Sequence, residues 1–98
     1  MQALSQHRAV VTGSSSGIGR ATALALAAAG ADVVVHARTS QDAAEQVAAE
    51  IRSLGRQSHV LLADLAHADA RGAFASQAWE LWDGVDLWIN NAGVDVLT

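Results

Sequence analysis

The feature that most constrains the fold is a regular alternation of short apolar runs with longer segments of helical character. The apolar runs have the length of strands and cover residues 8–12, 32–37, 58–63 and 85–91. Between them lie an alanine-rich segment and two segments with apolar residues at helical spacing, over residues 20–29, 41–54 and 68–82. Strands that alternate with helices predict an α/β fold, in which helices cover both faces of a parallel sheet.

The connections between these elements predict the order of the strands. Crossovers between parallel strands are right-handed. If the first two crossovers step one way and the third returns past the first strand, the order is 3-2-1-4. This is a Rossmann-like, doubly wound sheet in three α/β/α layers, with a ligand crevice between the carboxyl ends of strands 1 and 4. The segments that leave these two strands are residues 13–19 and 90–93.

The last apolar run has the pattern of a strand that is buried on both faces. Val85, Leu87 and Ile89 are expected to face one side of the sheet and Trp88 the other. Such a strand at the edge of a sheet exposes apolar surface. Apolar residues make up 51% of the chain and charged residues only 16%, which is apolar for a small globular domain. We therefore expect residues 1–98 to be one incomplete domain, the amino-terminal part of a larger protein.

The helix expected over residues 68–82 has apolar residues on two faces. The face expected in the core consists of Ala70, Ala73, Phe74, Ala78 and Leu81. Trp79 and Trp82, with Ala75, form a second apolar stripe beside it. We expect this stripe to pack against the next element, with a subunit interface as the alternative.

The segment that joins the first strand to the first helix reads T-G-S-S-S-G-I-G, from residue 12 to residue 19. Gly13 permits a tight turn, Gly17 a close approach of the backbone to phosphate, and Gly19 close packing of the new helix. The amino end of a helix presents N–H groups and the positive end of the helix dipole, an arrangement that holds a pyrophosphate. The sequence therefore predicts dinucleotide binding. Additional hydroxyl donors are expected on Ser14, Ser15 and Ser16.

Composition and charge argue against several other classes of protein. Cysteine is absent, which excludes disulfides and thiolate chemistry. The net charge is -4 and the six Lys and Arg residues are scattered, so nucleic acid is not an expected partner. No apolar run approaches the roughly 20 residues of a membrane span, and residues 1–7 lack the features of a signal peptide. We therefore expect a cytoplasmic protein without a membrane association. Four histidines lack the short spacings of a zinc site and are expected on the surface: His7, His36, His59 and His67.

Three motifs, in this order and at this spacing, resemble those of the short-chain dehydrogenase/reductase family. They are the glycine segment, the pair Asp64-Leu65 after the third strand, and N-N-A-G at residues 90–93. The resemblance covers the whole chain. It implies an oxidoreductase that transfers hydride between NAD(P) and a carbonyl or alcohol, and a homo-oligomer for the complete enzyme. The cofactor-binding residues that it implies are Gly13, Ser15, Ser16, Gly17, Ile18, Gly19, Asp64, Leu65, Asn91, Ala92 and Gly93. The resemblance gives Asn90 a more structural role.

The end of the second strand bears on the choice between NAD and NADP. An acidic residue at this point pairs with the ribose hydroxyls of NAD and repels a 2′-phosphate. Here the stretch is His36-Ala37-Arg38, without a carboxylate, and the guanidinium group of Arg38 offers a fork of donors suited to phosphate. We therefore expect NADP(H) to be favoured over NAD(H). The alternative is that Arg38 is a solvated loop cation, and Ser16 stands where many NADP-dependent relatives have a basic residue.

The resemblance also shows which catalytic groups the chain does not contain. In the family a serine and a Tyr-x-x-x-Lys pair follow the N-N-A-G segment, and the tyrosine exchanges the proton. The 98 residues contain no tyrosine, so we expect the chain alone to be inactive. Two other functions remain open: a non-catalytic dinucleotide-binding or interaction module, and a sugar-nucleotide epimerase or dehydratase, which the glycine spacing disfavours.

Overall fold

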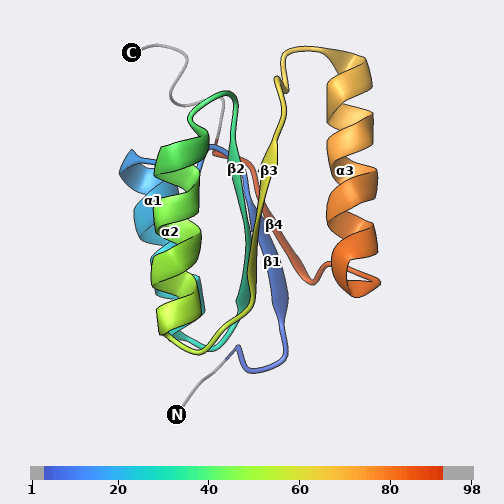
Figure 1. Ribbon diagram of the computed structural model, residues 1–98. Helices are drawn as coiled ribbons and strands as arrows, with labels where there is room; N and C mark the ends of the chain where they lie inside the picture. Colours follow the sequence, from blue (N-terminus) through green and yellow to red (C-terminus); the bar gives the residue numbers. More distant parts are fainter. Residues whose placement is uncertain (1–3, 92–98) are drawn as a thin grey trace.

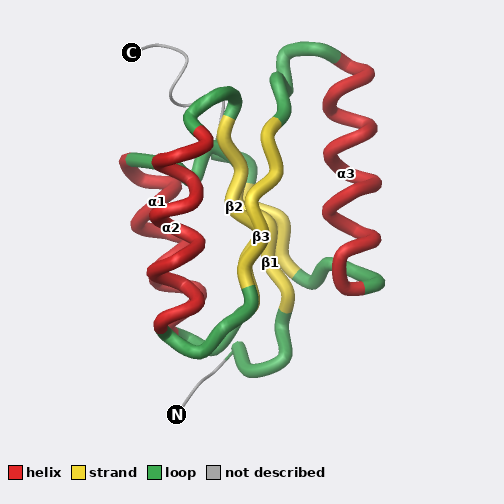
Figure 2. The backbone as a smooth tube through the Cα atoms, in the orientation of Figure 1, coloured by secondary structure: helices red, strands yellow, loops and turns green. Residues whose placement is uncertain are grey.

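The computed structural model describes residues 4–91, which form a four-stranded parallel sheet between two layers of helices (Figure 1). In chain order, the elements are β1 (Arg8–Val11), α1 (Gly17–Ala28), β2 (Asp32–Ala37), α2 (Gln41–Ser53), β3 (Ser58–Leu62), α3 (Ala68–Trp82) and β4 (Leu87–Ile89). The helices α1 and α2 cover one face of the sheet, and α3 covers the other (Figure 2). The predicted α/β class and its three layers are therefore confirmed.

The strands lie in the order β3-β2-β1-β4, which confirms the predicted order 3-2-1-4. In the register of the sheet, Val11 at the end of β1 pairs with Val35 of β2 and with Ile89 of β4. On the far side of β2, Ala37 pairs with Leu62 at the end of β3. The carboxyl ends of all four strands thus lie along one edge of the sheet, where the connecting loops begin.

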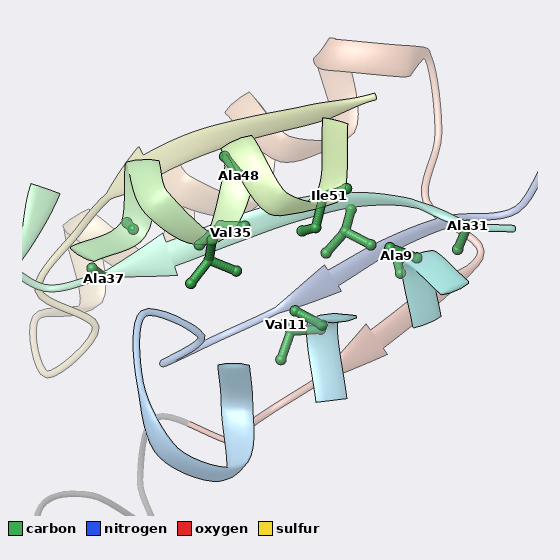
Figure 3. Close-up of a cluster of buried hydrophobic side chains, with 12 residues drawn as sticks. Ala9, Val11, Ala31, Val35, Ala37, Ala48 and Ile51 are labelled. Atoms are coloured by element: carbon green, nitrogen blue, oxygen red, sulfur yellow. The ribbon is translucent and has the colours of Figure 1, made fainter. Parts of the chain in front are cut away.

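The larger core cluster fills the space between the sheet and the helices α1 and α2. Alternate residues of the central strands, such as Val11 and Val35, point into it and are fully buried. Figure 3 shows Ala48 and Ile51 of α2 on the side of the sheet that carries Val35. The side chains that α1 buries completely in this cluster are those of Ala23 and Ala27, with Leu24 and Leu26 partly buried beside them.

The smaller core cluster lies under α3. Val10 and Val34 from the sheet pack there against Phe74 and Ala78, all of them buried. Ala73, which was also expected on the core face of this helix, is exposed. The fully buried stripe of this helix is therefore narrower than expected: it consists of Phe74 and Ala78, four residues apart, with Leu81 and Trp82 partly buried beside them.

The two tryptophans of α3 differ in their surroundings. Trp82 is half-buried, its indole N–H donates to Oε1 of Gln57 at 2.8 Å, and its ring lies 5.6 Å from that of His59. Trp79 is 55% exposed. The expected packing of this stripe against a neighbouring element is thus confirmed for Trp82, whereas Trp79 is largely exposed within residues 4–91.

The fourth strand is shorter than expected, and Val85 does not share a face with Leu87 and Ile89. Val85 packs in the cluster under α3, whereas Leu87 and Ile89 pack in the cluster under α1 and α2. The reason is that Val85 precedes the paired segment: contact with β1 begins where the backbone N–H of Asp86 donates to the carbonyl of Arg8. The strand alternation that the sequence suggested therefore begins two residues later.

Candidate dinucleotide-binding site

The glycine loop, residues 12–19, leaves β1 beside β4 and enters α1. Gly13 and Gly17 have φ values of 62° and 60°, in the left-handed region that favours glycine. Gly19 is required for space, because a Cβ atom there would lie 2.1 Å from the carbonyl oxygen of Gly13 and 2.6 Å from Nδ2 of Asn91. The expected close packing at Gly19 is present, but its neighbours are the loop itself and Asn91.

The amino end of α1 has features that suit an anion. Ser16 occupies the N-cap position and its side chain makes no capping bond, so the first N–H groups of the helix lack a side-chain partner among residues 4–91. The first turn of α1 carries no acidic residue, whereas α2 and α3 have Asp42 and Asp69 in theirs. The positive end of the α1 dipole is therefore not neutralised locally. Ile18, in the same turn, is 67% exposed.

The three serines of the loop differ in their roles. Ser14 is fully buried, its hydroxyl donates to the carbonyl of Val11 at 2.7 Å, and its Oγ accepts the backbone N–H of His36 at 2.9 Å. The expectation that Ser14 offers a hydroxyl donor to a ligand is therefore wrong. Ser15 is half-buried and Ser16 exposed, and within residues 4–91 neither hydroxyl has a hydrogen-bond partner.

His36 was expected on the surface and is instead buried at the end of β2, with an exposed fraction of 2%. Its Nδ1 atom accepts the backbone N–H of Gly13 at 2.8 Å, and its Nε2 atom lies 2.9 Å from the carbonyl oxygen of Ala63. The ring meets that of Phe74 edge-on, with centroids 5.0 Å apart. Burial lowers the pKa of His36, and the bond to the Ala63 carbonyl opposes this effect. The burial of His36 could have been predicted from the sequence. His36 lies two residues after Val34 in β2, so its side chain points to the same face of the sheet, the face that α3 covers.

Asn91 joins the glycine loop to the chain that leaves β4. Its backbone N–H donates to Oγ1 of Thr12 at 2.8 Å, and its side-chain amide donates to the carbonyl of Gly13 at 3.2 Å. Asn90 is exposed, and its Oδ1 atom accepts the indole N–H of Trp88. Asn91 thus has the structural contacts that were expected of Asn90.

The sequence also singled out two residues that lie outside the described part of the chain. These are Ala92 and Gly93.

Asp64 and Leu65 follow β3 and have different surroundings. The carboxylate of Asp64 is 41% exposed, its Oδ1 atom accepts the N–H of Ala66 at 3.1 Å, and its Oδ2 atom lies 3.6 Å from Nε2 of His67. The side chain of Leu65 packs in the cluster under α3, and its carbonyl accepts a bond from Arg71. The turn therefore holds the carboxylate of Asp64 at the surface, near the end of the sheet.

Arg38 follows directly after β2 and is exposed. Within residues 4–91 its guanidinium group has no hydrogen-bond or ion-pair partner. The N–H of Ala63 donates to the carbonyl of Ala37 at 3.1 Å, which places Arg38 and Asp64 at the ends of neighbouring strands. The sheet thus brings together residues that are distant in sequence. In the order of the strands, the ends of β3, β2, β1 and β4 lead to Asp64, Arg38, the glycine loop and Asn91.

Within residues 4–91 no group of three or more His, Asp or Glu side chains is placed to hold a metal ion. Over that range, too, no helix combines the length and the apolar character that crossing a membrane requires.

Comparison with known proteins identifies the family. The family model described as short chain dehydrogenase matches residues 7–98. The chain belongs to the short-chain dehydrogenase family. The resemblance to this family is therefore confirmed, and with it membership in a family of NAD(P)-dependent oxidoreductases.

Three short-chain dehydrogenases illustrate the similarity. A 3-oxoacyl-[acyl-carrier-protein] reductase of Synechocystis is 43% identical over 94 residues, which cover 96% of this chain and 38% of that protein. The crystal structure of a short chain dehydrogenase from Burkholderia cenocepacia in complex with NADP has 41% identity and a TM-score of 0.89, over 92% of this chain and 37% of that one. A 7α-hydroxysteroid dehydrogenase complexed with NADH and 7-oxo glycochenodeoxycholic acid has 36% identity and a TM-score of 0.84, over 90% and 34%.

These three short-chain dehydrogenases are much longer than this chain. The chain spans 38% of the Synechocystis reductase and 34% of the 7α-hydroxysteroid dehydrogenase. One solved relative holds NADP and another holds NADH. Membership in the family therefore leaves the choice of cofactor to the residues of the site.

Proposed function

We propose that this chain is the cofactor-binding part of an oxidoreductase that transfers hydride between NADP(H) and a carbonyl or alcohol. The observation that carries this proposal is the arrangement at the carboxyl ends of the paired strands β1 and β4. There the amino end of α1, without a capping side chain or an acidic residue, lies beside the segment that leaves β4. The unpaired N–H groups and the helix dipole would hold the pyrophosphate, with the hydroxyl groups of Ser15 and Ser16 as further donors.

The neighbouring strand ends would contact the rest of the dinucleotide. Gly13, Gly17 and Gly19 allow the loop to stay close to the phosphates, and Ile18 would cover them from the first turn of α1. The exposed carboxylate of Asp64 would accept the adenine amino group, beside the backbone of Leu65. Beyond the end of β4, the contacts would come from Asn91, Ala92 and Gly93.

Arg38 supports a preference for NADP(H) over NAD(H). The end of β2 carries no carboxylate, and the guanidinium group of Arg38 is exposed and without a partner among the described residues. A 2′-phosphate on the adenosine ribose would provide that partner through charge-assisted hydrogen bonds. A contact of this kind contributes about 1.5 to 3 kcal/mol, so it would favour NADPH by roughly tenfold or more.

Exchange of the charge at Arg38 tests this proposal. We expect the wild-type protein to bind NADPH more tightly than NADH, and Arg38→Asp to reverse or abolish this preference, as measured by nicotinamide fluorescence during titration. Arg52→Asp is a control with the same change in net charge, in the last turn of α2, away from the carboxyl ends of the strands. Because the guanidinium group of Arg52 donates to the carbonyl of Ser58, circular dichroism must show that this variant is folded. An unchanged preference in Arg38→Asp would refute the role of Arg38.

The same proposal places proton transfer outside these 98 residues. Carbonyl reduction needs a general acid within hydrogen-bond reach of the reacting oxygen, and the chain contains no tyrosine. We therefore expect the 98-residue chain alone to bind the dinucleotide without reducing a ketone. Turnover of NADPH by this chain alone would contradict that division of roles.

A further inference from the structure

We propose that His36 is a positioning residue for the dinucleotide: its neutral ring holds the glycine loop in the binding conformation, and protonation of the ring releases the loop. The inference rests on the proposed function, because it concerns the same loop. It adds a residue that is not among the proposed contacts with the dinucleotide. It also adds a pH dependence of binding, which follows from the hydrogen bonds of this residue.

His36 and the glycine loop are joined by three hydrogen bonds. The N–H of Ser14 donates to the carbonyl of His36, and the N–H of His36 donates to Oγ of Ser14, whose own hydroxyl donates to the carbonyl of Val11. The third runs from the N–H of Gly13 to Nδ1 of His36. The carbonyl of Gly13 is held from the other side by Asn91. Gly13 is therefore held between β2 and β4 by both of its polar backbone atoms.

Gly13 is coupled directly to the amino end of α1. The place where Gly19 would carry a Cβ atom is 2.1 Å from the carbonyl oxygen of Gly13. The peptide of Gly13 thus lies against the first turn of α1, whose N–H groups are proposed to hold the pyrophosphate. A shift of Gly13 must move this turn, or open the contact between the two.

The hydrogen bonds of His36 require a neutral ring with the proton on Nε2. Nδ1 must accept from Gly13, and Nε2 must donate to the carbonyl of Ala63. A protonated ring carries a hydrogen on both nitrogens, so Nδ1 would face the N–H of Gly13 with a second donor at 2.8 Å. The bond to Gly13 would then be lost, while the bond to Ala63 could remain.

The groups around the ring favour its neutral form. The loop presents Gly13, the end of β3 presents Ala63, and α3 presents Phe74, none of which carries a charge. Arg38 and Asp64 follow the ends of β2 and β3, but Arg38 is exposed, and the carboxylate of Asp64 contacts Ala66 and His67 instead. Burial is therefore the dominant influence, and it lowers the pKa of His36 below its ordinary value near 6.5.

Titration of NADPH binding against pH, from pH 5 to pH 8, tests the inference in the protein at its full natural length. In His36→Asn, the Oδ1 atom can take the place of Nδ1 as an acceptor and does not titrate. We expect the wild-type protein to lose affinity by about tenfold as the pH falls through the pKa of His36, and His36→Asn to lack this loss. His36→Phe keeps the ring and its burial but has no acceptor, so it should bind about tenfold more weakly at every pH.

Two controls isolate the effect of His36. His59→Asn alters an exposed histidine on β3 and should keep the wild-type pH profile. The 2′-phosphate of NADPH also titrates near pH 6, but it does so equally with every variant, so the difference between wild type and His36→Asn belongs to His36. Identical profiles for these two proteins would overturn the inference, as would tighter binding of NADPH by the protonated form.

Nuclear magnetic resonance of the wild-type protein without ligand provides a readout that depends on neither a variant nor the cofactor. The ring nitrogen shifts should identify the tautomer with the proton on Nε2, and the amide resonance of Gly13 should titrate together with the ring. Absence of NADPH binding at every pH would refute the proposed function. If the Gly13 amide resonance did not change as the His36 ring titrates, the role of His36 would be refuted, whatever the result of the binding experiment.

Discussion

Gly17 and Gly19 stand two residues apart in the glycine loop, and the backbone requires glycine at each for a different reason. At Gly17 a Cβ atom would meet nothing within 4 Å, but φ is 60°, which side chains disfavour. At Gly19 the backbone is helical, and the obstacle is the carbonyl of Gly13. Because that obstacle is backbone, it cannot move aside as a flexible side chain would.

Gly19→Ala is therefore expected to destabilise the protein. Relief of a 2.1 Å contact requires a shift of the loop or of α1, and overpacking of this kind typically costs about 1 to 3 kcal/mol. The control is Gly72→Ala, at a site in α3 with no atom within 4 Å of the added carbon, where the better helix propensity of alanine should stabilise by roughly 0.5 to 1 kcal/mol. Urea unfolding measures both changes, and the two variants should move the midpoint in opposite directions.

His36 makes a second residue-scale prediction, for stability instead of binding. Because burial lowers its pKa, the unfolded chain binds more protons than the folded chain between that lowered pKa and about 6.5. The contribution to the free energy of unfolding is thus complete above about pH 6.5 and decreases as the pH falls. Urea unfolding of wild type and His36→Asn between pH 5.5 and 7.5 measures it. Equal pH dependence in both proteins would show that His36 does not contribute.

At this scale, the sequence predicted positions that obey local rules and missed those that depend on distant partners. The glycines could be predicted because a strand, a tight turn and a helix start are adjacent in the chain. The burial of Ser14 and the ring contacts of His36 depend on residues more than 20 positions apart, so periodicity alone did not reveal them. The same reason explains why Asn91, with its bond to Gly13, has the structural role expected of Asn90.

Among the elements, the helices attach to the sheet in two ways. The helices α1 and α2 share a broad cluster and are also linked at the surface, where Arg20 donates to both carboxylate oxygens of Glu50 at 2.8 Å. The buried residues of α3 are Phe74 and Ala78. Phe74 contacts His36 and Trp88 through its ring, with centroid distances of 5.0 and 5.6 Å. The attachment of α3 therefore depends strongly on one side chain.

Phe74→Ala is expected to cost about 3 kcal/mol or more, because it removes a buried aromatic ring and leaves a cavity between α3 and the sheet. Trp79→Ala, on the exposed face of the same helix, should change the free energy of unfolding by no more than about 0.5 kcal/mol. Chemical denaturation followed by circular dichroism provides the comparison. Similar losses in the two variants would mean that α3 is not held through Phe74.

The elements themselves were predicted more completely than their ends. The bounds of β2 and α3 are those expected from the sequence, residues 32–37 and 68–82. The start of β4 was missed because Val85 continues the alternation of Leu87 and Ile89 in sequence although it does not pair with β1. The first paired residue depends on the position of the neighbouring strand, so the apolar pattern of β4 alone does not predict it.

At the scale of the whole molecule, the two clusters lie on opposite faces of the central strands. β1 and β2 contribute to both, and their valines are fully buried, whereas β3 and β4 are the edges of the sheet. The strand order was predicted from right-handed crossovers and from the assumption that the third crossover returns past the first strand. The sequence was thus sufficient for a correct topology under that assumption, but it did not reveal that one face of the sheet is covered by two helices with a large shared cluster and the other by a single helix.

This inequality predicts the pattern of amide hydrogen exchange. Amides of β1 and β2 should exchange most slowly, because they open only when both layers open. Amides of α3 and β4 should exchange faster, because detachment of α3 from the sheet, or separation of the edge strand β4 from β1, is enough to expose them. Exchange followed by mass spectrometry checks this order, and protection of α3 equal to that of β2 would contradict it.

The placement of the tryptophans gives the two layers different optical properties. The three tryptophans of the chain are Trp79 and Trp82 on α3 and Trp88 on β4, whose ring faces Phe74 of α3, and the chain contains no tyrosine. Intrinsic fluorescence therefore arises on the side of the sheet that α3 covers. The layer of α1 and α2, which carries the amino end proposed to hold the pyrophosphate, emits nothing of its own. The protein thus contains a built-in spectroscopic label for one of its two faces.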